Sequence, residues 1–372
     1  MNTVSQQLLQ YVLDQVTSIQ QIPAPTFSEQ KRAAYIQQEL ERLGLQEVHQ
    51  DVTGNVFACW PGRDRTALVV SAHLDTVFPD TGQPLLTRSL ERISGPGVGD
   101  NAMGLAALLG LGSWLVDARP VYPGDVWLVA NVCEEGLGNL AGMIAVANYF
   151  GEDVLAYLVL EGLGLGRVCH RGLGVSRFRI TVTTAGGHSW ADYGTPSAIH
   201  ELARLVTTLN EIVLPRKPRT TMNIGVIQGG TSVNTIAAKA CCELDLRCED
   251  QNTLGRLVNR IRRMVTSAER PGVAVTFEPI GMRPAGAIRP SHGLVKLALE
   301  CLADLNVMAE LEAGSTDANV PLSLGIPAIC VGITHGGGPH TDKEFLETGP
   351  VVTGLEQIVC LVNQVWRLGE RD

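Results

Sequence analysis

The chain has 372 residues, of which 45% are hydrophobic and 18% are charged, and it carries a formal net charge of −9. This length favours two domains over one, and the composition is typical of a globular protein with a large core. The acidic balance argues against general nucleic-acid binding, for which a basic surface is usual.

The N-terminal residues are polar and show no basic-then-apolar signal pattern, and no run of about 18 apolar residues is evident. We therefore expect no membrane segment and no membrane partner. The nine cysteines form no Cys-x-x-Cys motif, and several, such as Cys59, Cys133 and Cys330, lie inside apolar runs. This usage predicts reduced thiols, no disulfide framework and a cytoplasmic location.

Apolar runs that are typical of buried strands alternate with helical patterns over much of the chain. The expected helices cover residues 3–20, 29–43, 101–117, 142–150, 291–304 and 351–367. The expected strands cover residues 56–60, 67–77, 126–132, 154–160 and 328–333. Ser28 is the expected N-cap of the second helix, and Gly44 is expected to end it. This alternation predicts an α/β fold with an open sheet.

Residues 174–282 show a different pattern. Alternating apolar and polar residues predict a strand at 175–184. Further elements are expected in the order helix 196–213, strand 221–227, strand 235–248, helix 253–268 and strand 273–278. This order is typical of an α+β domain with an antiparallel sheet. We predict that it is inserted into a first domain made of residues 1–173 and 283–372.

Several polar residues follow the apolar strands or lie in the glycine-rich loop before the helix at 101–117. They are His73, Asp100, Glu135, Glu161 and His340. Ligands bind at the carboxyl ends of the strands in open α/β sheets, so we expect these side chains to converge. Two imidazoles and three carboxylates suit divalent zinc, and five ligands suit two ions that share a carboxylate.

Two further carboxylates fit this arrangement. Residues i and i+2 of an extended chain point to the same side, so Asp75 can orient the His73 imidazole. Neighbours on an extended chain point to different sides, so Glu134 can face a substrate while Glu135 binds an ion. A carboxylate in that place can act as a general base.

Each of these residues has a simpler interpretation when it is considered alone. Asp100 is placed as a helix N-cap, and residues 134–136 fit a solvated loop. The glycines at 95–99 do not indicate a nucleotide site, because no Gly-Lys-Ser/Thr follows them. The chain contains no Gly-x-Ser-x-Gly, which argues against a serine hydrolase. A non-catalytic metal-binding or ligand-binding protein stays open as the second hypothesis.

The same residues resemble the motifs of the M20 family of co-catalytic zinc peptidases and deacylases, in the same order and over nearly the whole chain. The family's His-x-Asp motif matches His73-Leu74-Asp75, and its loop with a bridging aspartate matches residues 95–104. Its double glutamate matches Glu134-Glu135, and its final histidine matches His340 in Pro339-His340-Thr341-Asp342-Lys343-Glu344. The chain departs from many members at Asn101, where they have lysine or methionine.

The resemblance implies a role for each of these residues. His73 and Glu161 would bind one ion, Glu135 and His340 the other, and Asp100 would bridge the two. Glu134 would be the general base, and Asp75 would orient His73. The implied cofactors are two Zn²⁺ ions, with Co²⁺ or Mn²⁺ as alternatives.

The resemblance also implies a mixed-sheet catalytic domain with an inserted lid and dimerisation domain. In the lid, His188 would stabilise the oxyanion, Asn234 would lie near the substrate and Arg247 would hold a substrate carboxylate. The implied activity is exopeptidase cleavage of small peptides, favoured by similarity to peptidase T-like members at 315–319 and 336–341. The alternative is an N-acyl amino acid deacylase of the acetylornithine deacetylase or desuccinylase type, and a homodimer is implied in either case.

Overall fold

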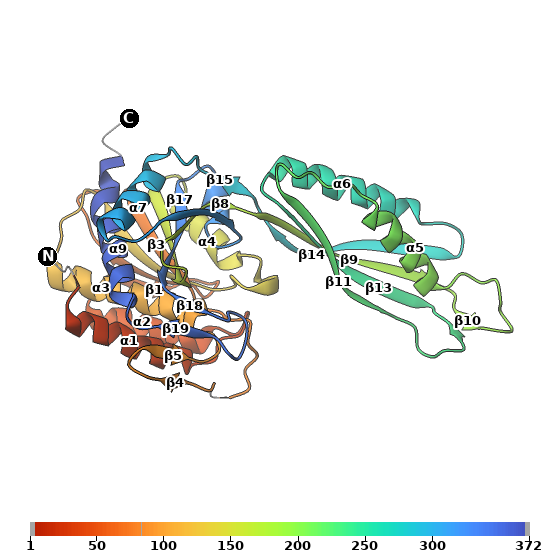
Figure 1. Cartoon of the computed structure of the whole chain (residues 1–372), viewed down its shortest axis with the longest axis horizontal. Helices are drawn as coiled ribbons and strands as arrows, with labels where there is room; N and C mark the ends of the chain where they lie inside the picture. Colours follow the sequence, from red (N-terminus) through yellow and green to blue (C-terminus); the bar gives the residue numbers. More distant parts are fainter. Residues whose placement is uncertain (1–3, 83, 369–372) are drawn as a thin grey trace. The chain divides into compact units, whose positions relative to one another are not determined.

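The structure is a computed structural model that describes residues 4–82 and 84–368. The chain divides into two compact units, one made of residues 1–172 and 286–372 and the other of residues 173–285 (Figure 1). The insertion therefore ends later than the expected residue 282. The reason is that the last strand of the second unit continues to Arg283, which still pairs with Val175.

Within the described residues, the first unit is built on a nine-stranded mixed sheet in the order β1-β2-β6-β3-β7-β17-β8-β15, with β16 paired to β8. Its strands are β1 (Gln46–Gln50), β2 (Val56–Trp60), β3 (Ala67–His73), β6 (Asp125–Asn131), β7 (Val154–Leu163), β8 (Arg167–Gly172), β15 (Gly286–Ala287), β16 (Glu310–Gly314) and β17 (Ala328–Thr334). Strand β3 runs parallel to β6 and β7, and β17 runs parallel to β7. The carboxyl ends of these four strands therefore share one edge, and the predicted mixed α/β fold is confirmed.

Helices bury the two faces of this sheet in separate apolar clusters. The larger cluster takes residues from α1 (Gln6–Gln20), α2 (Gln30–Leu43), α3 (Gly104–Ala118), α7 (Gly293–Asp304) and α9 (Val351–Gln364). The smaller cluster takes residues from α4 (Ala141–Phe150) and α8 (Asn319–Ser323). All seven residues of β3 are buried, so the strand that leads to His73 lies in the middle of the core.

A second, smaller sheet of the first unit was not expected from the sequence. It has the order β18-β19-β5-β4, formed by β18 (Gly336–Gly337), β19 (Phe345–Glu347), β5 (Arg92–Ser94) and β4 (Thr87–Arg88). Its strands have only two or three residues each, too few to show a periodic pattern. This sheet joins the segment before Asp100 to the segment that carries His340.

Three local expectations were wrong. The helix α2 begins at Gln30 with Glu29, not Ser28, in the N-cap position, although Gly44 does end it in a left-handed conformation. The helix expected at 101–117 begins later, at Gly104, after the irregular turn Val98–Met103, and this rules out the alternative interpretation of Asp100 as its N-cap. The third concerns the cysteines. Cys301 of α7 and Cys360 of α9 form a disulfide, while the described chain keeps seven other cysteines free.

The segment Val98–Ala118 is long and apolar enough to cross a membrane, although no such segment was predicted. However, most of this segment is buried inside the protein. Residues of α3 contribute to the larger apolar cluster, where they pack with α1, α2 and α9. We therefore interpret the segment as a core helix.

The second unit has the predicted α+β architecture (Figure 1). Four antiparallel strands follow the order β11-β13-β9-β14, with β9 (Gly174–Thr184), β11 (Thr220–Gly229), β13 (Lys239–Cys248) and β14 (Val273–Arg283). The helices α5 (Ala198–Asn210) and α6 (Gln251–Ser267) share an apolar cluster with one face of this sheet. A separate pair of short strands, β10 (Gly187–His188) and β12 (Thr235–Ile236), lies outside it.

Candidate metal centre

One histidine and two carboxylates form the first group of candidate ligands. His73 ends β3, and its Nε2 lies 3.0 Å from Oδ1 of Asp100 and 3.8 Å from Oε2 of Glu161. Glu161 lies near the end of the neighbouring strand β7. One ligand atom from each of the three residues lies within 4.8 Å of the others, which is close enough to hold one ion.

The second group shares Asp100 with the first. Nε2 of His340 lies 3.0 Å from Oδ2 of Asp100 and 3.1 Å from Oε1 of Glu135. The two oxygens of Asp100 therefore face two different imidazoles. This is the arrangement that a carboxylate needs in order to bridge two cations, which lie about 3.5–4 Å apart in two-metal sites.

The charges of this centre are strongly coupled. Burial and the charge of Asp100 raise the pKa of Glu135 to about 7, and contact with Asp100 raises the pKa of His340 to about 9. Burial alone would lower the pKa of His73, but its contacts with Asp100 and Asp75 raise it well above the usual value. Three converging carboxylates thus draw positive charge onto the two imidazoles, and divalent cations would supply that charge more fully. The donor set fits two such ions.

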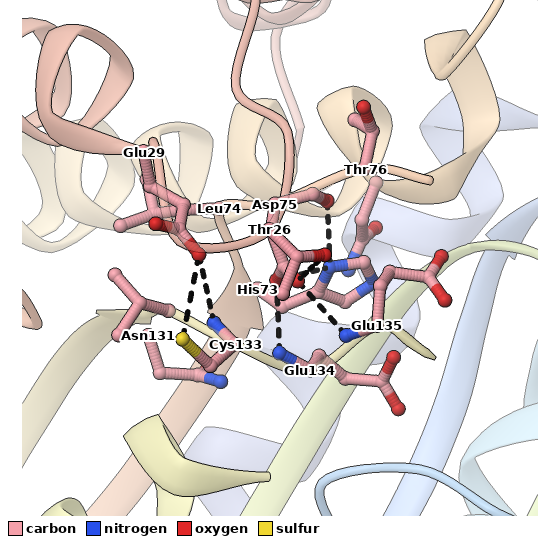
Figure 2. Close-up of polar contacts among 12 residues, drawn as sticks. Thr26, Glu29, His73, Leu74, Asp75, Thr76, Asn131, Cys133, Glu134 and Glu135 are labelled. Atoms are coloured by element: carbon pink, nitrogen blue, oxygen red, sulfur yellow. Dashed lines mark hydrogen bonds and ion pairs between the residues drawn. The ribbon is translucent and has the colours of Figure 1, made fainter. Parts of the chain in front are cut away.

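Asp75 acts mainly on the glutamate pair. The ring Nδ1 of His73 donates to the backbone carbonyl of Asp75 at 3.0 Å, whereas the Asp75 carboxylate lies 3.5 Å away from that nitrogen. The carboxylate instead accepts the backbone N–H groups of Glu134 and Glu135, both at 2.9 Å, and the hydroxyl of Thr26 at 2.9 Å (Figure 2). The carbonyl of Asp75 therefore orients the His73 ring so that Nε2 faces Asp100 and Glu161. The carboxylate of Asp75 holds the turn that carries Glu134 and Glu135.

The turn that carries Glu134 and Glu135 follows β6 and is also held by Glu29, the N-cap residue of α2. The buried carboxylate of Glu29 accepts the N–H of Cys133 at 3.1 Å, and Cys133 has a positive φ of 59°. Glu134 and Glu135 are both buried, and their side chains extend toward the same side in Figure 2. Glu134 can also supply a ligand atom close to His73 and Glu135. Its carboxylate is therefore near the candidate ions without being a member of the two groups that contain Asp100.

Sequence reasoning missed the buried polar residues that support the centre from α2. Arg32 is 2% exposed and donates to the carbonyl oxygens of Ile22 and Leu74, the latter at 2.8 Å. Together with Glu29 it places charged groups on the buried side of an amphipathic helix. Charged residues at positions that an amphipathic helix normally fills with apolar residues were the signal in the sequence that could have identified Glu29 and Arg32.

The glycine-rich loop is held by side chains that sequence reasoning also missed. The carboxylate of Glu344 accepts the backbone N–H groups of Gly97, Gly99 and Asp100, and burial raises the pKa of Glu344 to about 7. The Asn101 side chain donates to the carbonyl of Leu160 at 2.9 Å. Asn101 therefore ties the loop to β7, which carries Glu161.

The segment 315–319, whose sequence is similar to peptidase T-like members, includes two buried polar residues. Asp317 and Asn319 are fully buried, and Asp317 accepts a hydrogen bond at 2.7 Å from the side chain of Asn131. Burial raises the pKa of Asp317 to about 7. Asp317 thus connects β6 to the segment that leads into α8.

The predicted lid residues belong to the second unit. His188 pairs with Thr235 across β10 and β12, and the N–H of Ser189 donates to the carbonyl of Asn234 at 3.0 Å, so His188 and Asn234 lie together. Nδ1 of His188 faces the backbone N–H groups of Trp190 and Ala191 at 3.2 and 3.3 Å, and must accept from them. The neutral ring therefore carries its proton on Nε2.

Arg247 lies apart from this pair, on β13 of the four-stranded sheet. Its Nε donates to Oδ2 of Asp245 at 2.8 Å, and Asp245 also accepts from Nε of Arg177 at 2.9 Å. The guanidinium that was expected to hold a substrate carboxylate thus already contacts a carboxylate of its own strand.

Replacing the shared carboxylate should separate its role from that of the fold. We expect Asp100→Asn to weaken the binding of at least one Zn²⁺ ion by at least about 100-fold, because even outer-shell partners contribute 10–100-fold. Isothermal titration of the metal-free protein with Zn²⁺ measures this change. The control is Asp117→Asn, an exposed aspartate of α3. Two ions bound with unchanged affinity in Asp100→Asn would contradict the bridging arrangement.

Two family models match the chain. The model described as Peptidase dimerisation domain matches residues 172–273, and the model described as Peptidase family M28 matches residues 55–168. The first match coincides closely with the second unit, and the second covers the part of the first unit that carries four of the five candidate ligands.

Individual proteins are also similar to the chain. A Peptidase M20 domain-containing protein of Schizosaccharomyces pombe is 31% identical over 58% of this chain and 53% of its own length. The chain thus spans about half of that relative. A succinyl-diaminopimelate desuccinylase of Bordetella bronchiseptica is 26% identical over 68% of this chain and 72% of its own length.

A tripeptidase from Staphylococcus aureus has the same fold. Its crystal structure superposes with a TM-score of 0.81 at 21% identity, over 96% of this chain and 99% of that one. The motifs occur in the expected order, the dimerisation-domain model matches the inserted unit, and the named relatives agree with both. The chain is thus similar to M20 peptidases in the order of its motifs, in its inserted unit and in its fold.

Proposed function

We propose that the chain is an amide hydrolase that uses two Zn²⁺ ions, with Co²⁺ or Mn²⁺ as alternatives, and that it acts as an exopeptidase on small peptides. The observation that carries this proposal is the position of Asp100, whose two oxygens lie 3.0 Å from the imidazoles of His73 and His340 respectively. Glu161 and Glu135 complete the two groups. The fold shared with the Staphylococcus aureus tripeptidase supports the choice of small peptides.

In this proposal the protein's own residues supply positioning and proton transfer. Divalent ions in this site would polarise the scissile carbonyl and ease the deprotonation of water. Glu134 would take the proton of the attacking water and later give it to the leaving nitrogen. His188 would donate its Nε2–H to the developing oxyanion, which fits the tautomer that its backbone contacts select. Asn234 and Arg247 would contact the substrate.

The second candidate is an N-acyl amino acid deacylase. It is supported by the similarity to the Bordetella bronchiseptica desuccinylase over 72% of that protein. The two candidates share one chemistry, because each breaks an amide bond next to a carbonyl that two cations can polarise. They differ in the group on the acyl side of that bond, so a substrate panel separates them.

The activity test compares short peptides with N-acetyl and N-succinyl amino acids, using the zinc-loaded protein. We expect hydrolysis of di- or tripeptides, and we expect Glu134→Ala to reduce kcat by at least about 100-fold because general-base catalysis is lost. Both ions should stay bound in this variant, as measured by elemental analysis. The control is Glu152→Ala, an exposed glutamate outside the centre. Preference for N-acyl amino acids would favour the deacylase, and no hydrolysis in either set would reject the function.

We also propose that the protein is a homodimer that associates through its second unit. The dimerisation-domain model matches this unit, and β11 is an edge strand that exposes Val226 and Ile227. Edge strands with unpaired backbone groups readily pair with another chain. Light scattering should give twice the mass of the chain, and Ile227→Lys should shift it toward the monomer. Val213→Lys, another exposed residue of the same unit, should not. A wild-type monomer would contradict this proposal.

We further propose a cytoplasmic location. The seven free cysteines of the described chain, six of them buried, support it, whereas the disulfide between Cys301 and Cys360 is unusual for a reducing compartment. Fractionation of the native cells, with detection by antibody, should place the protein in the soluble cytoplasmic fraction. Recovery from the medium or from an envelope fraction would reject this location.

A further inference from the structure

Glu344 is a fully buried carboxylate that lies shortly after His340 in the chain. Its Oε2 accepts the N–H of Gly97 at 2.8 Å, and its Oε1 accepts the N–H groups of Gly99 at 2.8 Å and Asp100 at 2.7 Å. Successive backbone N–H groups that converge on one anion form a nest, and hydrogen bonds to a charged acceptor belong to the stronger class. Glu344 therefore fixes the main chain of the loop up to Asp100 itself.

The glycines of this loop offer no side chains of their own to hold its shape. Gly97 adopts a positive φ of 71°, and a Cβ added to Gly99 would lie 2.6 Å from Cγ of Leu163 on β7. The close approach to β7 thus requires residues without side chains. The carboxylate of Glu344 therefore anchors the glycine part of the loop through its backbone, while Asn101 ties the end of the loop to β7.

The same residue is also tied to the segment of His340. The N–H of Gly95 donates to the carbonyl of Glu344 at 2.9 Å, and the next residue, Phe345, pairs with Ser94 across β19 and β5. His340 lies between β18 and β19, which pair with each other. The segment of Glu344 thus leads directly to one histidine, while its side chain holds the carboxylate that faces that histidine.

We propose that Glu344 is a positioning residue that sets the distance between Asp100 and His340 and thereby the affinity of the ion held by Asp100, Glu135 and His340. This inference rests on the proposed two-metal function. Two of the three ligands of that ion depend on Glu344, one through the loop and one through its own segment. The ion held by His73, Asp100 and Glu161 depends on Glu344 through Asp100 alone. A change of Glu344 should therefore weaken the binding of the ion held by Asp100, Glu135 and His340 more strongly.

The test is calorimetric titration of the metal-free full chain with Zn²⁺, comparing wild type with Glu344→Gln. Glutamine keeps the size of the side chain but places an NH₂ group against a backbone N–H. We expect one ion to bind 10- to 100-fold more weakly and the other to change less. At limiting zinc, kcat should fall with little change in KM, and excess Zn²⁺ should restore it. The matched control is Glu347→Gln, on β19 in the same segment, which should bind both ions as the wild type does.

Glu344→Asp is the second variant, because it keeps the buried charge and shortens its reach. It should fold, as judged by circular dichroism, and show an intermediate loss of affinity for the same ion. Wild-type affinity for both ions in Glu344→Gln would overturn the inference. If Glu344→Gln does not fold, Glu344→Asp decides the question. The inference is then overturned if Glu344→Asp binds both ions with wild-type affinity, or if this variant does not fold either. A wild type that binds two Zn²⁺ ions but hydrolyses no amide would instead reject the proposed function and leave this inference intact.

Discussion

The contact of Asp100 with two imidazoles is the interaction on which the rest of the structure depends. One oxygen faces His73 at the end of β3, and the other faces His340, which lies 240 positions away from Asp100 in the chain. Asp100 is the residue that the two groups share, so it links them into one centre. The position of Asp100 must therefore be well defined. Glu344 holds the backbone N–H of Asp100, and the neighbouring Asn101 is tied to β7.

A common device holds the segments that carry the ligands. Three buried carboxylates accept backbone N–H groups from these segments and contribute no ligand in either group. Asp75 holds Glu134 and Glu135, Glu29 holds Cys133, and Glu344 holds the loop of Asp100. A buried carboxylate stays charged only where donors surround it, so each bond stabilises both partners.

In the second unit, pairing of short strands and backbone contacts position the predicted lid residues. His188 and Asn234 are distant in sequence but lie together because β10 pairs with β12. The backbone contacts of His188 select the tautomer that donates from Nε2, so the ring is prepared as a donor without any help from a charged neighbour. Arg247, in contrast, shares Asp245 with Arg177. Binding a substrate carboxylate there would require competition with this ion pair.

The sequence by itself determined the mixed α/β architecture, the inserted α+β unit and the five residues that converge on the centre. Those features rest on long apolar runs and on the rule that parallel strands end at one edge, and both are local signals. Only the tertiary structure decided how these residues are held. The small sheet of two- and three-residue strands, the disulfide of Cys301 and Cys360 and the contacts of Glu344 join segments that are far apart in the chain. Such pairings leave no periodic trace in the sequence, because they depend on which surfaces meet after the chain has folded.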